Sequence, residues 1–241
     1  RSSAASDVYK RQVLVLLSIC QACEQDPAFS FKGEDRIYFS YPKALDYMGR
    51  ETDYELDSLT YSFVTLPDEI TFDTVWVKVK RVGERSATDK HYAVTVVRDS
   101  STAIEGVDFE ELKPAYVFRK NLGVDSLPLI IYREHLKTTL SKNILLKLKE
   151  TDDFKIGYVE YATFKVSISD LYPVPDDWYL VSGHLGAYHY LKYEKWIELT
   201  GSTKFGNSAS FRTYYCGLIK EYFNTGNIID PITGERVTCN L

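Results

Sequence analysis

The strongest constraint on the fold of this chain is a series of short segments in which apolar and polar residues alternate. In the first of them, Val75, Val77 and Val79 alternate with Trp76 and Lys78. The same period of two recurs at residues 92–96, 127–131, 144–148 and 164–168. Because successive side chains of a strand point to opposite faces, this period predicts strands that each bury one face.

Three further segments, at residues 36–41, 59–63 and 116–118, have the composition of strands. Seven or eight short strands with turn residues between them are typical of an immunoglobulin-like antiparallel β-sandwich. Pro128 predicts that its strand begins at a sheet edge, because proline cannot donate a ladder hydrogen bond. The polar segment 43–57 is predicted to be a loop, and residues 236–238 a last strand.

The period becomes helical after a proline-rich connector at residues 173–178. One helix is predicted from Leu185 to Leu199, and a second from a capping Ser208 to Gly226. The second helix has seven apolar residues at i, i+3, i+4 spacing on one face: Phe211, Tyr214, Tyr215, Leu218, Ile219, Tyr222 and Phe223. This stripe is interpreted as packing against a partner helix or the sandwich, and the alternative is an aromatic binding groove.

The amino-acid composition argues against some classes of function and suits others. The net charge is −5 and the isoelectric point is about 5.5, which argues against a nucleic-acid-binding protein with a basic face. The chain has 19 tyrosines. Tyrosine in short runs suits strands, and it also suits a surface that stacks on sugars or on other proteins.

The first residues read as a targeting segment. Residues 1–12 resemble a translated sequencing-adaptor tail and are given no role in the fold. Residues 13–20 are apolar but too short to span a bilayer. The following Cys20-Gln21-Ala22-Cys23 resembles the lipobox of a bacterial lipoprotein, which implies cleavage before Cys23 and a lipid on its thiol. The alternative is an ordinary secretory signal with a coincidental cysteine.

The chain is therefore divided into four parts. Residues 1–22 are the tail and signal peptide, and residues 23–35 are a polar tether. Residues 36–172 form the sandwich, and residues 173–241 form a helical segment packed on it. The lipid is the expected membrane anchor, and the expected location is the outer membrane, either at the cell surface or on its periplasmic face.

No catalytic or metal-binding motif is found in the sequence. The four histidines, His91, His135, His184 and His189, lack the spacing of a helical zinc site. No cofactor is therefore expected. A pair of catalytic carboxylates could still be dispersed along the chain. In an oxidising compartment Cys216 and Cys239 could form a disulfide, and two isolated thiols are the alternative.

Several short motifs recur in the same order in a known family. They are the lipobox, the segment 37–39, the turn 103–109, Trp178, and the pair of segments 185–188 and 192–193. In these motifs the chain resembles a Bacteroidetes lipoprotein family catalogued as a domain of unknown function. Its genes often lie beside starch-utilisation-type (SusC/SusD-like) outer-membrane uptake pairs. The resemblance implies a role in nutrient binding and no known catalytic residue.

The turn Ala103-Ile104-Glu105-Gly106-Val107-Asp108-Phe109 also resembles that of Calx-β domains, sandwiches that can bind calcium. The resemblance makes Glu105 and Asp108 weak calcium candidates, with Asp125 a more distant third. Calcium takes six to eight oxygen ligands, and the sequence does not assemble them.

These observations predict a non-catalytic cell-envelope lipoprotein that binds a glycan or peptide as an accessory component of an uptake system. One alternative is a hydrolase of the same locus that uses a dispersed carboxylate pair. Another is a structural adhesion module, which would have no ligand pocket and an exposed sheet edge.

Overall fold

The computed structural model describes residues 33–46, 48–206 and 208–240. The predicted signal peptide, the lipobox with Cys23 and most of the tether lie outside these residues. Among the described residues, none of the helices has both the length and the hydropathy of a membrane span.

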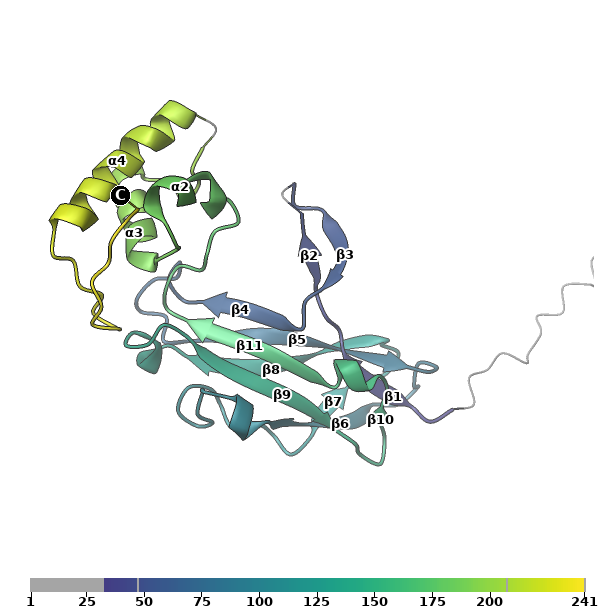
Figure 1. Ribbon diagram of the computed structural model, residues 1–241. Coiled ribbons are helices and arrows are strands. Elements are labelled where there is room, and N and C mark those ends of the chain that lie inside the picture. Colours follow the sequence, from purple (N-terminus) through teal and green to yellow (C-terminus); the bar gives the residue numbers. More distant parts are fainter. Residues whose placement is uncertain (1–32, 47, 207, 241) are drawn as a thin grey trace, which may run out of the picture. The chain divides into compact units, whose positions relative to one another are not determined.

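The chain is mainly β and forms two sheets and a hairpin (Figure 1). The four-stranded sheet has the order β10 (Lys155–Ile156), β1 (Arg36–Phe39), β5 (Phe72–Val82) and β8 (Val124–Tyr132). The five-stranded sheet has the order β4 (Ser58–Ser62), β11 (Thr163–Ser169), β9 (Lys142–Lys149), β6 (Lys90–Val96) and β7 (Tyr116–Phe118). The hairpin pairs β2 (Lys43–Leu45) with β3 (Glu51–Glu55).

One hydrophobic core lies between the two sheets and confirms the predicted sandwich. It is built from the alternating residues of both sheets, including Val77 and Leu129 from one and Val94, Leu146 and Val166 from the other. Each of these side chains is at most 6% exposed. The two-residue period of the sequence therefore located the buried faces correctly.

The sequence predicted antiparallel pairing, and two of the strand pairs differ from this prediction. Most pairs are antiparallel, but β1 pairs with β10 and β4 pairs with β11 in parallel. The predicted loop at residues 43–57 contains the hairpin of β2 and β3. The predicted last strand is reduced to a single bridge between Ile229 and Arg236. The edge position inferred from Pro128 is confirmed, because β8 ends the order of its sheet.

Three helices follow the strands: α2 (Ser182–Leu185), α3 (Tyr190–Thr200) and α4 (Ala209–Thr225). The second predicted helix is confirmed, and the Ser208 hydroxyl caps it by accepting from the Phe211 amide. The first predicted helix is wrong at its start. Gly186 has a φ of 77°, which ends α2, and α3 begins only at Tyr190. Short 3₁₀ helices lie at Arg98–Ser100, Glu134–Leu136, Val159–Tyr161 (η4) and Trp178–Leu180.

The helices have their own hydrophobic cluster, which includes Trp196, Cys216, Ile219 and Phe223. The apolar stripe predicted on α4 is therefore divided. Ile219 and Phe223 are buried in the cluster, whereas Phe211, Tyr214 and Tyr222 are 42–64% exposed.

Candidate binding site: the tyrosine pocket

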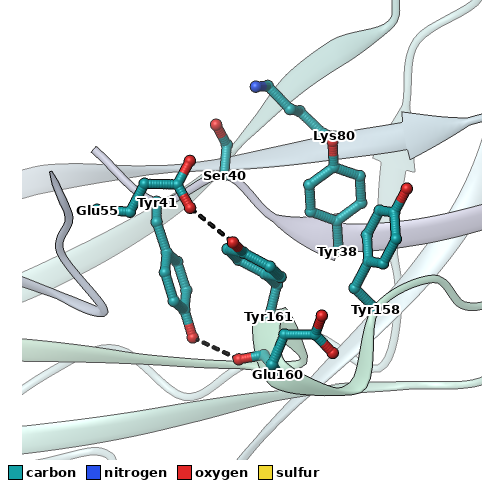
Figure 2. A pocket seen from close by; sticks show the side chains of 8 residues that line it. All are labelled: Tyr38, Ser40, Tyr41, Glu55, Lys80, Tyr158, Glu160 and Tyr161. Atoms are coloured by element: carbon teal, nitrogen blue, oxygen red, sulfur yellow. Dashed lines mark hydrogen bonds between the residues drawn. The ribbon is translucent and has the colours of Figure 1, made fainter. Parts of the chain in front are cut away.

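A pocket of about 330 Å³ opens beside strand β1 (Figure 2). We call it the tyrosine pocket, because four of its residues are tyrosines. Its lining consists of Tyr38, Ser40, Tyr41, Glu55, Lys80, Tyr158, Glu160 and Tyr161. These residues come from β1 and the two residues after it, from the end of β3, from β5, and from η4 with Tyr158 just before it, so the pocket joins four segments of the chain.

The parallel pairing of β1 with β10 assembles the pocket. It places Ile37 beside Ile156, and the Gly157 amide then donates to the Ile37 carbonyl at 2.8 Å. A Cβ atom at Gly157 would lie 3.2 Å from that carbonyl oxygen and 3.5 Å from the Tyr38 ring. Glycine therefore allows the chain to pass close to β1, which brings η4 and its tyrosines against Tyr38.

The rings form a connected aromatic cluster. Tyr38 lies 5.1 Å from Tyr158 and 5.9 Å from Tyr161, both in edge-to-face arrangements. The Tyr41 and Tyr161 centroids are 4.7 Å apart. These geometries are favourable for aromatic pairs, so contacts between the rings stabilise the cluster without a ligand. Tyr158 is 48% exposed, which leaves part of its surface open to solvent.

Two hydrogen-bonded contacts fix the pocket wall. The Tyr41 hydroxyl lies 2.9 Å from the Glu160 carbonyl and 2.8 Å from the Thr163 carbonyl. The Tyr161 hydroxyl donates to the Glu55 carboxylate at 2.6 Å, as Figure 2 shows. Burial, together with neighbouring Tyr158 and Glu55, raises the pKa of Tyr38. The phenol therefore keeps its proton at neutral pH and can act as a hydrogen-bond donor.

The remaining polar groups of the pocket have no partner among the described residues. They are the Tyr38 and Tyr158 hydroxyls, the Ser40 hydroxyl, the Lys80 ammonium and the Glu160 carboxylate. In Figure 2 the hydroxyls of Tyr38 and Tyr158 point to the same side. The site therefore combines a wall of aromatic rings with donors and acceptors available to a ligand.

The residues proposed from the calcium resemblance have other contacts. The Asp108 carboxylate, which is fully buried, accepts from the Ile104 amide and pairs with Lys142 at 2.7 Å. Glu105 accepts from the Leu112 amide and lies 3.8 Å from Arg98. Within the described ranges, no group of three or more His, Cys, Asp or Glu could hold a metal ion. Asp125 pairs with Arg119 and is not brought to the turn.

The other sequence candidates lie in the helical part. Cys216 and Cys239 are free, buried thiols of the same hydrophobic cluster, and burial raises the pKa of Cys216 to about 11. His189 caps α3, because its Nδ1 atom accepts from the Leu191 amide at 3.3 Å. Its Nε2 atom lies 3.4 Å from Asp230, so both ring nitrogens have structural partners.

Three of the motifs that carried the family resemblance, namely Trp178 and the segments 185–188 and 192–193, are explained by contacts in the helical part. The buried Lys192 ammonium donates to the carbonyls of Leu185, the last residue of α2, and Ala187, two residues further on. The Trp178 indole donates to the Gly186 carbonyl at 3.2 Å. These contacts explain the spacing of the motifs through the packing of the helical cluster, and none of them lies in the tyrosine pocket.

The sequence did not single out the pocket residues. The signals were the abundance of tyrosine, which has a second explanation in strand composition, and the family motif at residues 37–39, which contains Tyr38. Tyr38 and Tyr41 lie about 120 residues from Tyr158 and Tyr161, as the 119-residue separation of the Tyr41–Glu160 contact illustrates. A local pattern could not have brought these two segments together.

Architecturally, the chain is a β-sandwich protein with a C-terminal helical cluster. Residues 31–202 match the family described as Domain of unknown function (DUF4843), so the chain belongs to that family. This result confirms the resemblance to a family of unknown function. No curated protein matches the chain.

Some solved structures are similar to part of the chain. The apo form of the Calx CBD1 domain is 16% identical with a TM-score of 0.36, over 57% of this chain and 98% of that one. A candidate carbohydrate-binding protein from Bacteroides ovatus ATCC 8483 is 9% identical with a TM-score of 0.37, over 56% of this chain and 37% of that one. A protein of unknown function from Bacteroides ovatus is 12% identical with a TM-score of 0.37, over 56% and 44%. Similarities at this level carry no functional argument.

Proposed function

We propose that the protein is a non-catalytic cell-envelope lipoprotein that binds a glycan in the tyrosine pocket as an accessory component of a nutrient-uptake system. The observation that carries the proposal is the composition of the pocket. The exposed Tyr158 ring and the partly exposed rings beside it can cover the apolar face of a sugar, and the unpartnered hydroxyl, ammonium and carboxylate groups can bond to its hydroxyls. Ligand sites commonly combine an apolar wall with a few convergent polar groups in this way.

A sugar fits the pocket better than a peptide strand does. Peptides usually add to a free sheet edge through main-chain hydrogen bonds. The pocket does not present such an edge, because β1 pairs with β10 on one side and with β5 on the other. Recognition here would therefore depend on side chains, which suits a ligand rich in hydroxyl groups.

Binding is tested with the soluble protein from residue 34 onward on a glycan array, followed by calorimetry with the glycans retained. The expected result is binding that Tyr158→Ala weakens about tenfold, as expected for removal of an aromatic contact. Tyr214→Ala is a matched control, because Tyr214 is also exposed but lies on α4. Absence of binding to any glycan, or equal loss in both variants, would contradict the proposal.

A hydrolase remains the second candidate, because Glu55 and Glu160 approach the same pocket from distant segments. Both glutamates are exposed. A general acid usually needs a buried carboxyl that keeps its proton at neutral pH, so this arrangement favours binding over hydrolysis. Chromatography of retained glycans after long incubation with the protein is the test. Shortened products that disappear with Glu160→Gln would support the hydrolase.

The envelope location rests on the sequence. The resemblance of residues 20–23 to a lipobox and the family's frequent position beside SusC/SusD-like uptake pairs support it. Cys23→Ala is expected to remove the protein from the outer-membrane fraction of its host. Purification of the lipidated protein from native membranes, followed by mass spectrometry, should recover an uptake porin and its lid lipoprotein. An unchanged fractionation of Cys23→Ala would contradict the anchoring.

A further inference from the structure

The outer face of the four-stranded sheet carries large apolar side chains where a sandwich usually has polar ones. On β5 the outward row includes Phe72 and Trp76, which are 61% and 62% exposed. On β8 the residues paired with this row are also largely apolar. We call the set the β5–β8 face, and it consists of Phe72, Trp76, Pro128, Ile130 and Tyr132.

Strands β9 and β11 of the other sheet have a different composition, although Val117 of β7 is 48% exposed. The exposed members of the outward rows of β9 and β11 are all lysines, namely Lys147, Lys149 and Lys165. Exposed apolar side chains gathered on one face mark an interaction surface more often than single exposed residues do. The β5–β8 face is therefore a second candidate surface for contact with a ligand, beside the tyrosine pocket.

The β5–β8 face is continuous with the tyrosine pocket. Lys80 lines the pocket, pairs across the strands with Tyr38, and belongs to the same outward row of β5 as Trp76. At a rise of about 3.3 Å per residue, Trp76 lies roughly 13 Å from Lys80 along the strand, and Phe72 lies roughly 13 Å further. Aromatic side chains thus recur along the outward row of β5, which reaches the pocket at Lys80.

We infer that the protein binds an extended polysaccharide chain, which begins in the tyrosine pocket and runs along β5, with Trp76 as a second stacking position. This inference rests on the proposed glycan binding and adds the ligand's length and direction. A path of this length exceeds one or two sugar rings. Lys78, which is exposed between Trp76 and Lys80, supplies a hydrogen-bond donor to the hydroxyl or carboxylate groups of the polysaccharide.

Affinity electrophoresis of the soluble protein in gels that contain galactomannan, xyloglucan, amylopectin or polygalacturonan identifies the polymer that retards it. Calorimetry then compares a disaccharide and an octasaccharide of that polymer. The wild-type protein should bind the octasaccharide at least tenfold more tightly. Trp76→Ala should remove that advantage and leave the disaccharide affinity unchanged, whereas Tyr158→Ala should weaken both about tenfold. Tyr214→Ala is the control for an exposed aromatic residue elsewhere.

The outcomes separate the two proposals. If Tyr158→Ala weakens binding but Trp76→Ala leaves the octasaccharide affinity unchanged, the extended site is overturned and the pocket stands. If no polymer retards the protein, the extended site is overturned, and the glycan array decides separately whether the pocket binds a glycan. If light scattering finds a dimer that Trp76→Ala dissociates, the β5–β8 face binds a second copy and the extended site is also overturned. Thermal unfolding of each variant confirms that the substituted chains remain folded.

Discussion

The Tyr161 hydroxyl donates a 2.6 Å hydrogen bond to the Glu55 carboxylate, across 106 residues of sequence. This bond connects the hairpin of β2 and β3 to η4 and orders one wall of the tyrosine pocket (Figure 2). Because the phenol donates to an acid, the neighbouring Glu55 and partial desolvation raise the pKa of Tyr161. The bond therefore persists through the neutral pH range.

Tyr161→Phe tests whether this ordering matters for binding. The ring and its contacts with Tyr38 and Tyr41 remain, and only the hydrogen bond to Glu55 is lost. Glycan affinity should fall about fivefold, which corresponds to the loss of one hydrogen bond. Glu55→Gln is the matched control, because its amide oxygen can still accept from Tyr161 and affinity should be retained. Calorimetry with the array-selected glycan measures both.

Asp108→Ala is expected to destabilise the sandwich by about 3 kcal/mol, because it leaves Lys142 without its partner inside the protein. It also removes the acceptor of the Ile104 amide. Asp108→Asn should cost less, because an amide oxygen can still accept from Ile104. Urea unfolding followed by tryptophan fluorescence compares the two. An equal loss in both would show that the charge of Asp108 alone is important.

Calcium should leave the melting temperature unchanged. The carboxylates of the turn already face Lys142 and Arg98, so a cation would have to displace these pairs. Calcium also requires more oxygen ligands than Glu105 and Asp108 supply. Differential scanning fluorimetry with millimolar CaCl₂ and with chelator is the measurement. A reproducible rise in melting temperature that Asp108→Asn abolishes would restore the calcium hypothesis.

Acid should destabilise the helical part of the protein, because His189 and Asp230 become protonated. Burial lowers the pKa of His189, and the nearby Asp230 offsets this only in part. The unfolded chain then binds the proton more readily, so stability falls as the pH drops below about 6.5. For Asp230, burial alone would raise the pKa, but bonds from Tyr190, Ile232 and Thr233 lower it overall. Its contribution is present above pH about 4 and is lost as the pH falls through its lower folded pKa.

His189→Asn separates the loss of stability caused by protonation of His189 from the loss caused by protonation of Asp230. Asparagine is a good helix-capping residue and can still accept from the Leu191 amide, but it has no charge to gain. The variant should lose the decline that begins below about pH 6.5 and keep the decline that begins below about pH 4. Urea unfolding at a series of pH values is the measurement, and His184→Asn is the control. A decline near pH 6 that persists in His189→Asn would assign it to another group.

The sequence predicted what depends on local periodicity and missed what depends on distant pairing. Alternation placed Val77, Leu129, Leu146 and Val166 in the core correctly, because one buried face determines the two-residue period. Helical spacing predicted α4 to within one residue at each end. The first helix was placed five residues too early, because the positive φ of Gly186 interrupts a pattern that otherwise continues.

The tyrosine pocket could not be predicted from local periodicity, because it depends on pairing between segments that are distant in the sequence. It exists because a two-residue strand, β10, pairs in parallel with β1, and no period can be measured in two residues. The hairpin that supplies Glu55 was also missed, since its strands are short and mostly polar. By contrast, the alternation around Trp76 predicted that its side chain faces solvent. That it belongs to an apolar face became apparent only from the residues of β8 that pair with β5.

Gly157→Ala tests the close passage that assembles the pocket. The added methyl group would meet the Ile37 carbonyl at 3.2 Å, so η4 must move away from β1 by a few tenths of an ångström. We expect a loss of about 1–2 kcal/mol in the free energy of unfolding, as for moderate overpacking. Glycan affinity should fall because Tyr158 and Tyr161 move relative to Tyr38. Gly183→Ala is the control, because a Cβ atom there meets nothing within 4 Å. Unchanged affinity in Gly157→Ala would show that the pocket tolerates this displacement, and that its rings do not act as one surface.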